Sequence, residues 1–408
     1  MAHYDIAIIG GGAAGMMAAA RCVGTGKHVI LLEKNRECGK KVLITGKGRC
    51  NITNTSPWRE FQTHLHPDKG FIKSAFHHFS NSDIVDFLES IGLPCKVERG
   101  NRVFPVSDKS HDVRDALVRY IADGGIKIAT GCEVRTVNSV SDSYQLDVDA
   151  SNGDRVTLMA SRVIVATGGL SYPTTGSTGD GYSIAKRLGH KMTDTFPSLT
   201  ALKPVNIDSR LDGLLLKNVK MDLWENGAVV QSEFGEILFT SGGIEGALGF
   251  RVSRKGVKGL INGQKVELSI DLKPAVSVED LNKRIREMIG ELGGFKVNKL
   301  LQKLMPSQMV ESFSEGASGL NADNLASRLK DWRFRIIDYV GYERCVVTAG
   351  GVSLDEISRK TMESKLSQGL YFAGEVIDMD GDTGGYNLQI AFSTGALAAD
   401  SAVKSLFI

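Results

Sequence analysis

This 408-residue sequence contains little proline and no marked excess of one charge. Only 9 prolines occur against 46 glycines, so the glycines indicate tight turns and close backbone approach rather than a disordered, proline-rich chain. The 49 lysines and arginines nearly cancel the 47 aspartates and glutamates, which leaves a formal net charge of +2. A charge this small gives no electrostatic reason to bind nucleic acid or an anionic membrane. We therefore expect neither as a partner.

Cysteine pairs and long apolar runs are also missing. The six cysteines include no C-x-x-C pair, which is typical of a reduced cytosolic protein with neither a metal site nor a redox dithiol. No run of about eighteen apolar residues occurs, so no transmembrane helix is predicted. Residues 1–5 contain no lysine or arginine ahead of the apolar stretch 6–20, which argues against a signal peptide. We expect a cytoplasmic protein.

The N-terminal segment has the pattern of a βαβ unit. Residues 4–9 (YDIAII) predict a buried strand that stops at three successive glycines. A helix of small residues follows at about 13–25, and residues 28–33 (HVILLE) predict a second buried strand. Strand, glycine turn, helix and strand in this order imply a parallel sheet.

The glycines of this turn have the spacing of a dinucleotide-binding fingerprint. Gly10 permits a tight turn, Gly12 lets the backbone approach a diphosphate, and Gly15 lets the helix pack on the sheet. The helix begins at Ala13 and Ala14, and its free N–H groups and positive dipole end would face the diphosphate. The alternative is a plain tight turn in an α/β core.

The second strand ends in Glu33, followed by Lys34, and we predict that both residues bind the cofactor. The carboxylate of Glu33 can accept hydrogen bonds from both ribose hydroxyls and would repel a 2′-phosphate. This residue therefore favours FAD or NAD over NADP.

A second glycine-helix device lies near the C-terminus and favours FAD over NAD. Residues 369–373 (GLYFA) predict a buried strand that runs into a glycine, and a double glycine opens a helix at about 385–402. In two-dinucleotide flavoproteins this arrangement lets an acidic side chain hold the ribityl chain, while the helix N-terminus faces the pyrimidine end of the flavin. The predicted cofactor-binding residues here are Gly374, Glu375, Asp378, Gly385, Asn387 and Leu388. The alternative is a capped strand followed by a terminal helix.

The remaining pattern predicts an α/β fold of two domains. Further helices are expected at 71–92 and 111–123, and further strands at 126–129, 132–137, 144–149, 155–159 and 162–166. In the middle of the chain, residues 215–240 and 257–271 alternate like strands and residues 278–332 are helix-like. We predict a two-dinucleotide-binding, glutathione-reductase-like Rossmann-type FAD domain with one large insertion. The predicted ranges are 1–191 and 341–408 for the FAD domain, with a small antiparallel layer near 126–160, and 192–340 for the insertion, with a β part at about 192–275 and a helical part at about 276–335.

Four further segments carry a resemblance to a known family: 39–54 (GKKVLITGKGRCNITN), 102–107 (RVFPVS), 173–182 (PTTGSTGDGY) and 346–355 (VVTAGGVSLD). Together with both glycine motifs, they make the chain similar to bacterial flavoproteins known as aminoacetone oxidase-like or bile-acid (steroid enone) reductase-like FAD enzymes. The resemblance spans almost the whole chain, and it implies FAD and a split two-dinucleotide-type fold with an inserted domain. Members usually carry a histidine and Ser-Gly-Pro in the insertion, whereas residues 239–249 read FTSGGIEGALG with Ser241 in place of the histidine. If that histidine takes part in the chemistry of the relatives, their substrate does not carry over to this chain.

The residues of the loop at 45–51 (TGKGRCN) also predict cofactor contacts independently of the resemblance. Arg49 and the backbone of this Gly-x-Gly loop can place a cation and N–H donors beside the diphosphate and the flavin. Cys50 stands where disulfide reductases of this fold carry their redox cysteines, but it has no second cysteine four or five residues away. We therefore expect Cys50 to be a close neighbour of the flavin rather than a nucleophile. The predicted cofactor-binding residues of this region are Lys41, Thr45, Gly46, Arg49, Cys50 and Asn51.

Two mid-chain strands complete the predicted cofactor site. Val134 is expected to contact the adenine through its backbone N–H and C=O groups, and the alternative is an ordinary strand valine. Thr167 and Gly168 follow the strand that passes beneath the flavin in this fold, where glycine permits close approach. Residues 176–182 (GSTGDGY) resemble a loop that fumarate-reductase-type flavoproteins place near the ring.

We expect an FAD-dependent oxidoreductase that transfers hydride between the flavin and a small organic substrate, by amine oxidation or enone reduction. Only one fingerprint is present, so electrons either pass to dioxygen or come from NAD(P)H that binds transiently. The alternative class is a flavin-dependent RNA-modifying or partner-binding protein, against which the neutral charge and the lack of a basic stripe argue. No catalytic residue is predicted, because the eight histidines show no ligand spacing on a clear helix face.

Overall fold

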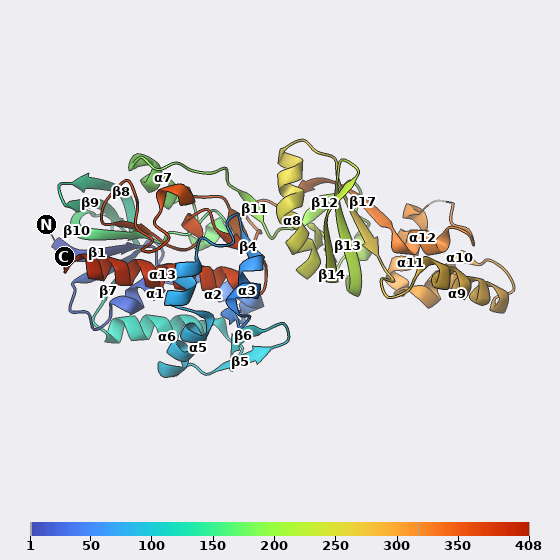
Figure 1. Cartoon of the computed structure of the whole chain (residues 1–408), viewed down its shortest axis with the longest axis horizontal. Coiled ribbons are helices and arrows are strands. Elements are labelled where there is room, and N and C mark those ends of the chain that lie inside the picture. The colour runs from blue at the N-terminus through green and yellow to red at the C-terminus, as the bar shows by residue number, and fades with distance from the viewer. Residues whose placement is uncertain (1, 318, 408) are drawn as a thin grey trace. The chain divides into compact units, whose positions relative to one another are not determined.

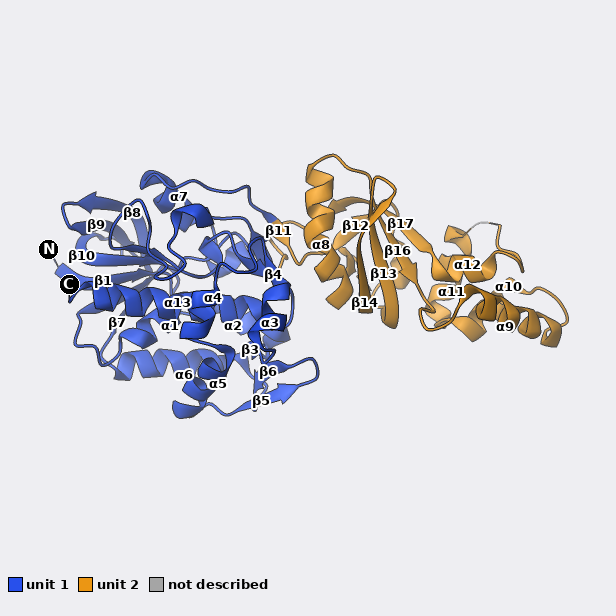
Figure 2. Ribbon diagram, in the orientation of Figure 1, with its two compact units in different colours: residues 1–196, 347–408 blue, residues 197–346 orange. Residues whose placement is uncertain are grey.

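The computed structural model describes residues 2–317 and 319–407, which fall into two compact units (Figures 1 and 2). Unit 1 consists of residues 1–196 and 347–408, and unit 2 of residues 197–346. The predicted domains, 1–191 with 341–408 and 192–340, have the same discontinuous order and begin a few residues earlier at each boundary.

A seven-stranded sheet forms the centre of unit 1. Its order is β7-β2-β1-β10-β9-β8, and β19 also pairs with β10. The strands are β1 (Ala2–Ile9), β2 (Val29–Glu33), β7 (Lys127–Thr130), β8 (Cys132–Val140), β9 (Ser143–Ala150), β10 (Arg155–Val165) and β19 (Leu370–Phe372). Strands β7, β2, β1, β10 and β19 run parallel, whereas β9 is antiparallel to both β10 and β8. Unit 1 therefore has the predicted α/β class.

Strand β10 corrects the prediction of two strands at 155–159 and 162–166, because it is one strand of 11 residues. The predicted break at residues 160–161 does not occur, because Ala160 still pairs with Tyr144 of β9 and Arg162, whose Nε donates to Ser405 Oγ at 2.7 Å, continues the same strand. Residues 155–160 pair with β9 and residues 163–165 pair with β19, so β10 joins the antiparallel and parallel parts. The predicted antiparallel layer near 126–160 is also wrong for β7, which pairs in parallel with β2.

The helices of unit 1 include two that pack against each other, α1 (Ala13–Cys22) and α13 (Tyr386–Ser405) (Figure 1). A Cβ atom added at Gly395 of α13 would lie 2.4 Å from the carbonyl oxygen of Ala14, so the two backbones touch. The other helices are α2 (Lys40–Ile44), α3 (Trp58–Phe61), α4 (Lys73–His78), α5 (Asn81–Ser90), α6 (Ser110–Asp123) and α7 (Asp180–Arg187). Short strands are β3 (Thr53–Asn54), β4 (Leu65–His66), β5 (Cys95–Glu98), β6 (Arg102–Pro105), β18 (Val347–Ala349) and β20 (Asp380–Gly381).

Unit 2 contains a closed barrel of order β12-β15-β14-β13-β16-β17 and a group of helices. Its strands are β12 (Leu202–Pro204), β13 (Leu215–Glu225), β14 (Ala228–Thr240), β15 (Gly243–Glu245), β16 (Val266–Asp271) and β17 (Trp332–Tyr339), and β11 (Phe196–Ser198) spans its first boundary. Its helices are α8 (Gly246–Ile261), α9 (Val278–Glu291), α10 (Val297–Leu304), α11 (Ser307–Gly316) and α12 (Leu325–Lys330). The predicted strand at 257–271 is wrong in its first part, which belongs to α8, because Leu248, Val252 and Val257 form a buried helical stripe.

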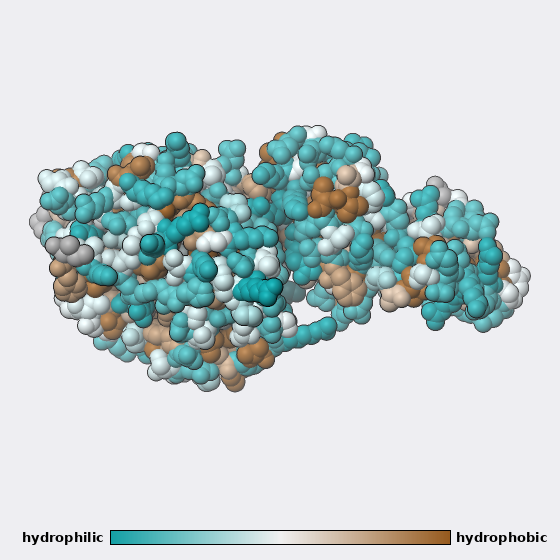
Figure 3. All heavy atoms as spheres, in the orientation of Figure 1, coloured by the Kyte–Doolittle hydropathy of each residue, from teal (hydrophilic) through white to brown (hydrophobic). Residues whose placement is uncertain are grey.

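The surface gives no sign of a membrane-spanning element in the part of the chain that the structure describes. No described helix combines the length and the apolar character needed to cross a bilayer. The face seen in Figure 3 is mainly hydrophilic, and its apolar patches are small and separate.

Candidate functional site

The glycine turn after β1 forms an open cradle at the start of α1. A Cβ atom at Gly10, where φ is +102°, would lie 2.5 Å from the carbonyl oxygen of Ala166, and one at Gly15 would lie 1.8 Å from the carbonyl oxygen of Gly10. These two positions require glycine for close packing. At Gly12, by contrast, an added Cβ would meet no atom within 4 Å. The open space lies at the helix start, where first-turn N–H groups such as that of Ala13 have no partner inside the helix. This arrangement fits a diphosphate.

Glu33 lies at the end of β2, directly beside this turn, and its side chain is buried at 7% exposure. Its Oε2 atom accepts from the N–H of Gly11 at 2.8 Å, and its Oε1 atom accepts from the N–H and the Nδ2 of Asn35, both at 2.7 Å. A carboxylate has about four acceptor positions, so these three bonds leave capacity on Oε2. The predicted hydrogen bonds to both ribose hydroxyls stay a prediction.

Lys34 and Asn35, which follow β2, form hydrogen bonds with the segment 175–180. The Nζ of Lys34 contacts Thr178 Oγ1 at 2.6 Å and Asp180, and Asn35 Nδ2 donates to the carbonyl of Thr175 at 3.0 Å. The loop at 176–182 also reaches the residues after β10, because a Cβ atom at Gly168 would lie 2.9 Å from Ser177 Oγ, and its place near the flavin ring stays a prediction.

Val134 lies in β8. The N–H of Gly131, the residue just before β8, donates to the carbonyl of Asn35 at 2.7 Å, so this strand begins beside the residues that follow β2. The pairing of β8 with β9 shifts register between Val134 and Thr136, which breaks the regular ladder at the predicted adenine-contacting position.

A partly buried ion pair links the first signature segment to the C-terminal motif. Lys41 Nζ donates to Glu375 Oε2 at 3.0 Å and to Ser171 Oγ at 2.8 Å. Glu375 Oε1 accepts from Ser171 Oγ at 2.6 Å and from the N–H of Thr348 at 2.8 Å. Burial opposes ionisation of Glu375, but the charge of Lys41 and these hydrogen bonds hold its pKa below the ordinary value. A Cβ atom at Gly168 would lie 4.0 Å from Lys41 Nζ, so the predicted Thr167–Gly168 position borders this cluster.

The start of α13 packs on the other side of the first signature segment. A Cβ atom at Gly385, where φ is +99°, would lie 2.4 Å from the backbone of Thr53. With its amide oriented to satisfy both ends, Asn51 accepts from the N–H of Gly385 at 3.0 Å. Thr53 Oγ1 also bonds the buried Gln389 at 2.6 Å. The segment at 39–54 and the start of α13, more than three hundred residues apart in sequence, therefore pack directly against each other.

The start of α1, which follows the first glycine turn, contacts the C-terminal motif at Gly374. A Cβ atom there would lie 2.8 Å from the Cβ of Ala14. Asp378 is partly buried, and its N–H donates to the carbonyl of Val352 at 3.0 Å. Asn387 Nδ2 donates to the carbonyl of Gly381 at 2.7 Å, which fixes the turn before α13, and Leu388 packs against the unit 1 core.

Arg49 forms ion pairs with two carboxylates, Glu98 and Asp108. Its Nε donates to Asp108 at 2.8 Å and its Nη1 to Glu98 at 3.2 Å, while the guanidinium stands over the ring of Phe104, 4.2 Å from its centroid. Two carboxylates thus neutralise its charge, and its predicted contact with the diphosphate stays a prediction.

Cys50 is fully buried in a strained turn, with φ at +60°. Its N–H donates to the carbonyl of Thr45 at 3.0 Å, and a Cβ atom at Gly46 would lie 2.8 Å from the N of Asn51, so the loop is tightly packed. Burial raises the pKa of the Cys50 thiol to about 12, although a bond with Thr45 opposes this. The thiol is therefore protonated near neutral pH and is a poor nucleophile.

We expect Cys50→Ser to retain FAD and to remain reducible, with a shifted flavin spectrum, because the hydroxyl replaces a weak hydrogen-bonding group of similar size. The bulky Cys50→Trp should give apoprotein. Stopped-flow traces of the reductive and oxidative half-reactions check this. A Cys50→Ser variant that keeps its yellow colour but cannot be reduced would mean that the thiol takes part in the chemistry.

The sequence did not point to a cluster of His64, His66 and Asp382, which the structure brings together at the start of α13. The signal was present as His64-Leu65-His66, because alternate residues of a strand face the same side. Among residues 2–317 and 319–407, no group of three or more His, Cys, Asp or Glu side chains is arranged to hold a metal ion.

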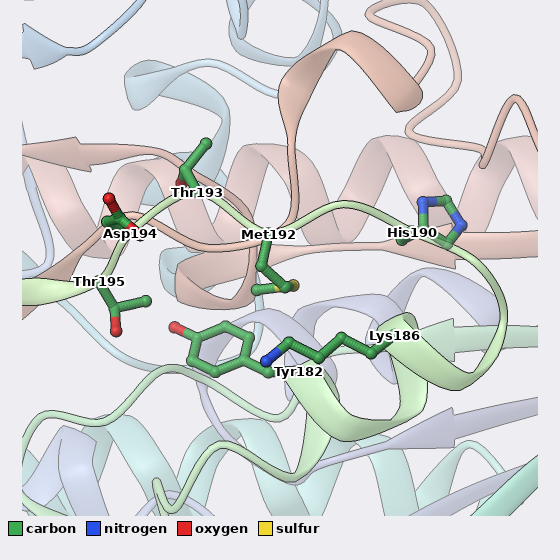
Figure 4. A pocket seen from close by; sticks show the side chains of 7 residues that line it. All are labelled: Tyr182, Lys186, His190, Met192, Thr193, Asp194 and Thr195. Atoms are coloured by element: carbon green, nitrogen blue, oxygen red, sulfur yellow. The ribbon is translucent and has the colours of Figure 1, made fainter.

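A separate hollow of about 410 Å³ lies beside α7 (Figure 4). Tyr182 and Lys186 of α7 face the segment 190–195, and the other lining residues are His190, Met192, Thr193, Asp194 and Thr195. Most of these side chains are polar, unlike the predominantly apolar lining of most small-molecule sites.

Fold and site together define a flavoprotein oxidoreductase whose cofactor is FAD. A family model for the HI0933-like protein Rossmann domain matches residues 4–401, so the chain belongs to the HI0933-like family. A 3-dehydro-bile acid delta(4,6)-reductase of Clostridium scindens is 31% identical over 414 residues, which cover 98% of this chain and 99% of that protein.

Two other similar proteins extend the comparison. A ribosomal RNA dihydrouridine synthase of Escherichia coli is 31% identical over 419 residues, 99% of each chain. The solved structure of a 3-ketosteroid delta1-dehydrogenase from Sterolibacterium denitrificans superposes with a TM-score of 0.55 at 13% identity, and covers 99% of this chain and 100% of that one, which supports the fold. The predicted absence of a nucleic-acid partner stays a prediction, because two similar proteins, from Escherichia coli and Haemophilus influenzae, are named for ribosomal RNA.

Proposed function

We propose that this chain is an FAD-dependent reductase of a carbon–carbon double bond conjugated with a carbonyl group. The observation that carries the proposal is the likeness, over nearly the whole chain, to two relatives whose named reactions share this chemistry. A delta(4,6)-reductase of a 3-dehydro-bile acid saturates double bonds conjugated with the 3-oxo group. Formation of dihydrouridine saturates the uracil C5–C6 bond, which is conjugated with the C4 carbonyl. Of the two predicted classes, enone reduction therefore takes precedence over amine oxidation.

In this proposal the chain's residues hold FAD from both ends. The turn at Gly10, Gly12 and Gly15, with Ala13 and Ala14, binds the diphosphate, Glu33 and Lys34 bind the adenosine end, and Val134 contacts the adenine. Lys41, Thr45, Gly46, Arg49, Cys50, Asn51, Thr167, Gly168, Gly374, Glu375, Asp378, Gly385, Asn387 and Leu388 surround the remainder. When bound and reduced by an electron donor, the cofactor would supply a hydride to the substrate. The start of α13, with its positive dipole end, stabilises negative charge at the pyrimidine end of the ring.

The test begins with the purified yellow protein, reduced under anaerobic conditions with dithionite. A 3-oxo-delta(4,6) bile acid, a uridine-containing ribosomal RNA fragment and, as the control for the other class, the oxidised enzyme with aminoacetone are then added separately. We expect reoxidation by the steroid dienone, seen as recovery of the flavin absorbance. Reoxidation by the RNA alone would keep the reaction type and change the substrate class to RNA. Reduction by aminoacetone without reoxidation by either acceptor would overturn the proposal. Titration with NADH and NADPH identifies the electron donor.

A further inference from the structure

The cluster of His64, Asp382 and His66 joins two segments at one end of α13. Asp382 Oδ2 bonds His64 Nδ1 at 2.8 Å, and Asp382 Oδ1 bonds His66 Nε2 at 3.3 Å. The carboxylate is 17% exposed, whereas the two imidazoles are 29% and 30% exposed. One shielded anion therefore lies between two rings that solvent and small molecules can reach.

The backbone holds this cluster in place. Strand β20 pairs with β4, with Asp380 opposite His66, and the N–H of Asp382 donates to the carbonyl of His64 at 2.9 Å. Asn387, in the first turn of α13, bonds both the N–H and the carbonyl of Gly381. The ring of Tyr386 stacks on that of His64 with centroids 4.4 Å apart. The imidazole of His64 is therefore fixed against the helix start that the proposed function places at the flavin.

The charges of the cluster suit a proton donor. Burial opposes ionisation of Asp382, but the hydrogen bonds from His64 and His66 hold its pKa at about 2, so it is an anion near neutral pH. A carboxylate accepts, so His64 presents Nδ1–H to it and directs Nε2 to the opposite side of the ring. An imidazole oriented in this way can give up a proton at its second nitrogen.

We propose that His64 is the catalytic proton donor of the reductase and that Asp382 is its positioning residue. This inference rests on the proposed function. The carbon β to the carbonyl accepts a hydride supplied by the reduced cofactor, and the electron pair of the double bond moves to the α carbon. There a new C–H bond forms as the Nε2–H bond of protonated His64 breaks, and the neutral imidazole regains a proton from solvent. Besides His66, which bonds the same carboxylate, titratable residues beside the cluster include Asp380, opposite His66 in the pairing of β20 with β4, and Tyr386, whose ring stacks on that of His64.

The test compares His64→Gln, Asp382→Asn and a control, His78→Gln. His78 forms a similar pair with a carboxylate, Asp400, at 2.7 Å but lies outside the cluster. Each reduced variant is mixed with the enone and, separately, with ferricyanide, whose reduction needs no proton on carbon. We expect His64→Gln to slow reoxidation by the enone by about 10²-fold or more. Its reaction with ferricyanide should stay within about threefold of wild type, as should both reactions of His78→Gln.

Two further readouts separate proton donation from a structural role. In wild type the rate of reoxidation by the enone should fall with rising pH, because only a protonated ring supplies the proton, and this pH dependence should vanish in His64→Gln. Asp382→Asn should slow reoxidation by the enone and leave the reaction with ferricyanide within about threefold of wild type, because the proton donor is no longer oriented. Equal enone rates in wild type and His64→Gln, or a pH dependence that persists in His64→Gln, would overturn the assignment. A wild-type enzyme that no enone reoxidises would instead overturn the proposed function, and this role with it.

Discussion

The Glu33→Arg variant should purify folded but largely colourless. The substitution removes a carboxylate that binds the N–H of Gly11 and of Asn35 at a site only 7% exposed, and it puts a cation where a ribose hydroxyl needs an acceptor. A hydrogen bond to a charged group contributes about 1.5–3 kcal/mol, so FAD affinity should fall by about 10- to 150-fold. Each donor left without an acceptor costs a further 1–3 kcal/mol or so of stability.

The measurement is the ratio of flavin to protein absorbance after gel filtration, together with a titration of the apoprotein with FAD. The matched control is Glu37→Arg, which makes the same change on the same loop at a side chain 50% exposed and paired with Arg114. The control should stay yellow. Full occupancy and unchanged affinity in Glu33→Arg would remove Glu33 from the ribose site.

Gly15→Ala should unfold the glycine turn or release the cofactor, although alanine is the better helix former. In an ordinary helix this exchange stabilises by roughly 1 kcal/mol. Here the added Cβ would lie 1.8 Å from the carbonyl oxygen of Gly10, a backbone atom that cannot rotate away. Such overpacking costs about 1–3 kcal/mol and displaces the turn from the diphosphate position.

Gly290→Ala in α9 is the matched control, because a Cβ there would meet no atom within 4 Å. It should leave FAD bound and raise stability by a few tenths of a kcal/mol to about 1 kcal/mol. Urea unfolding followed by circular dichroism, with flavin fluorescence for release, distinguishes the two. If Gly15→Ala behaves like Gly290→Ala, the close contact between α1 and its turn does not exist in solution.

In unit 1, the sequence pattern correctly predicted those elements whose interactions are between residues close in sequence. The strand, glycine turn and helix at residues 4–25 are neighbours in sequence, and both glycine motifs follow from what a backbone needs near a diphosphate. The predicted break in β10 at residues 160–161 failed because Ala160 pairs with Tyr144 of β9, a partner that the local pattern did not indicate. The start of the predicted strand at 257–271 failed because its apolar residues serve the buried stripe of α8 instead.

Long-range pairing explains what the sequence left open at the candidate site. Nothing near His64 and His66 in sequence indicates Asp382, and only the pairing of β4 with β20 joins them. The charge partners of Arg49, Glu98 and Asp108, are likewise set by tertiary packing, so a basic residue beside a glycine loop was not enough to place its guanidinium.

Because unit 1 is discontinuous in sequence, it cannot fold completely until the C-terminal part of the chain has been synthesised. Residues 197–346 are synthesised before β19 and α13, so unit 2 can close while β10 still lacks its neighbour β19 and α1 lacks the helix that covers Ala14. Contacts between residues this distant in sequence close late and slowly. Because the predicted FAD site takes residues from both ends of the chain, we expect cofactor binding only after α13 has been synthesised and has packed on α1.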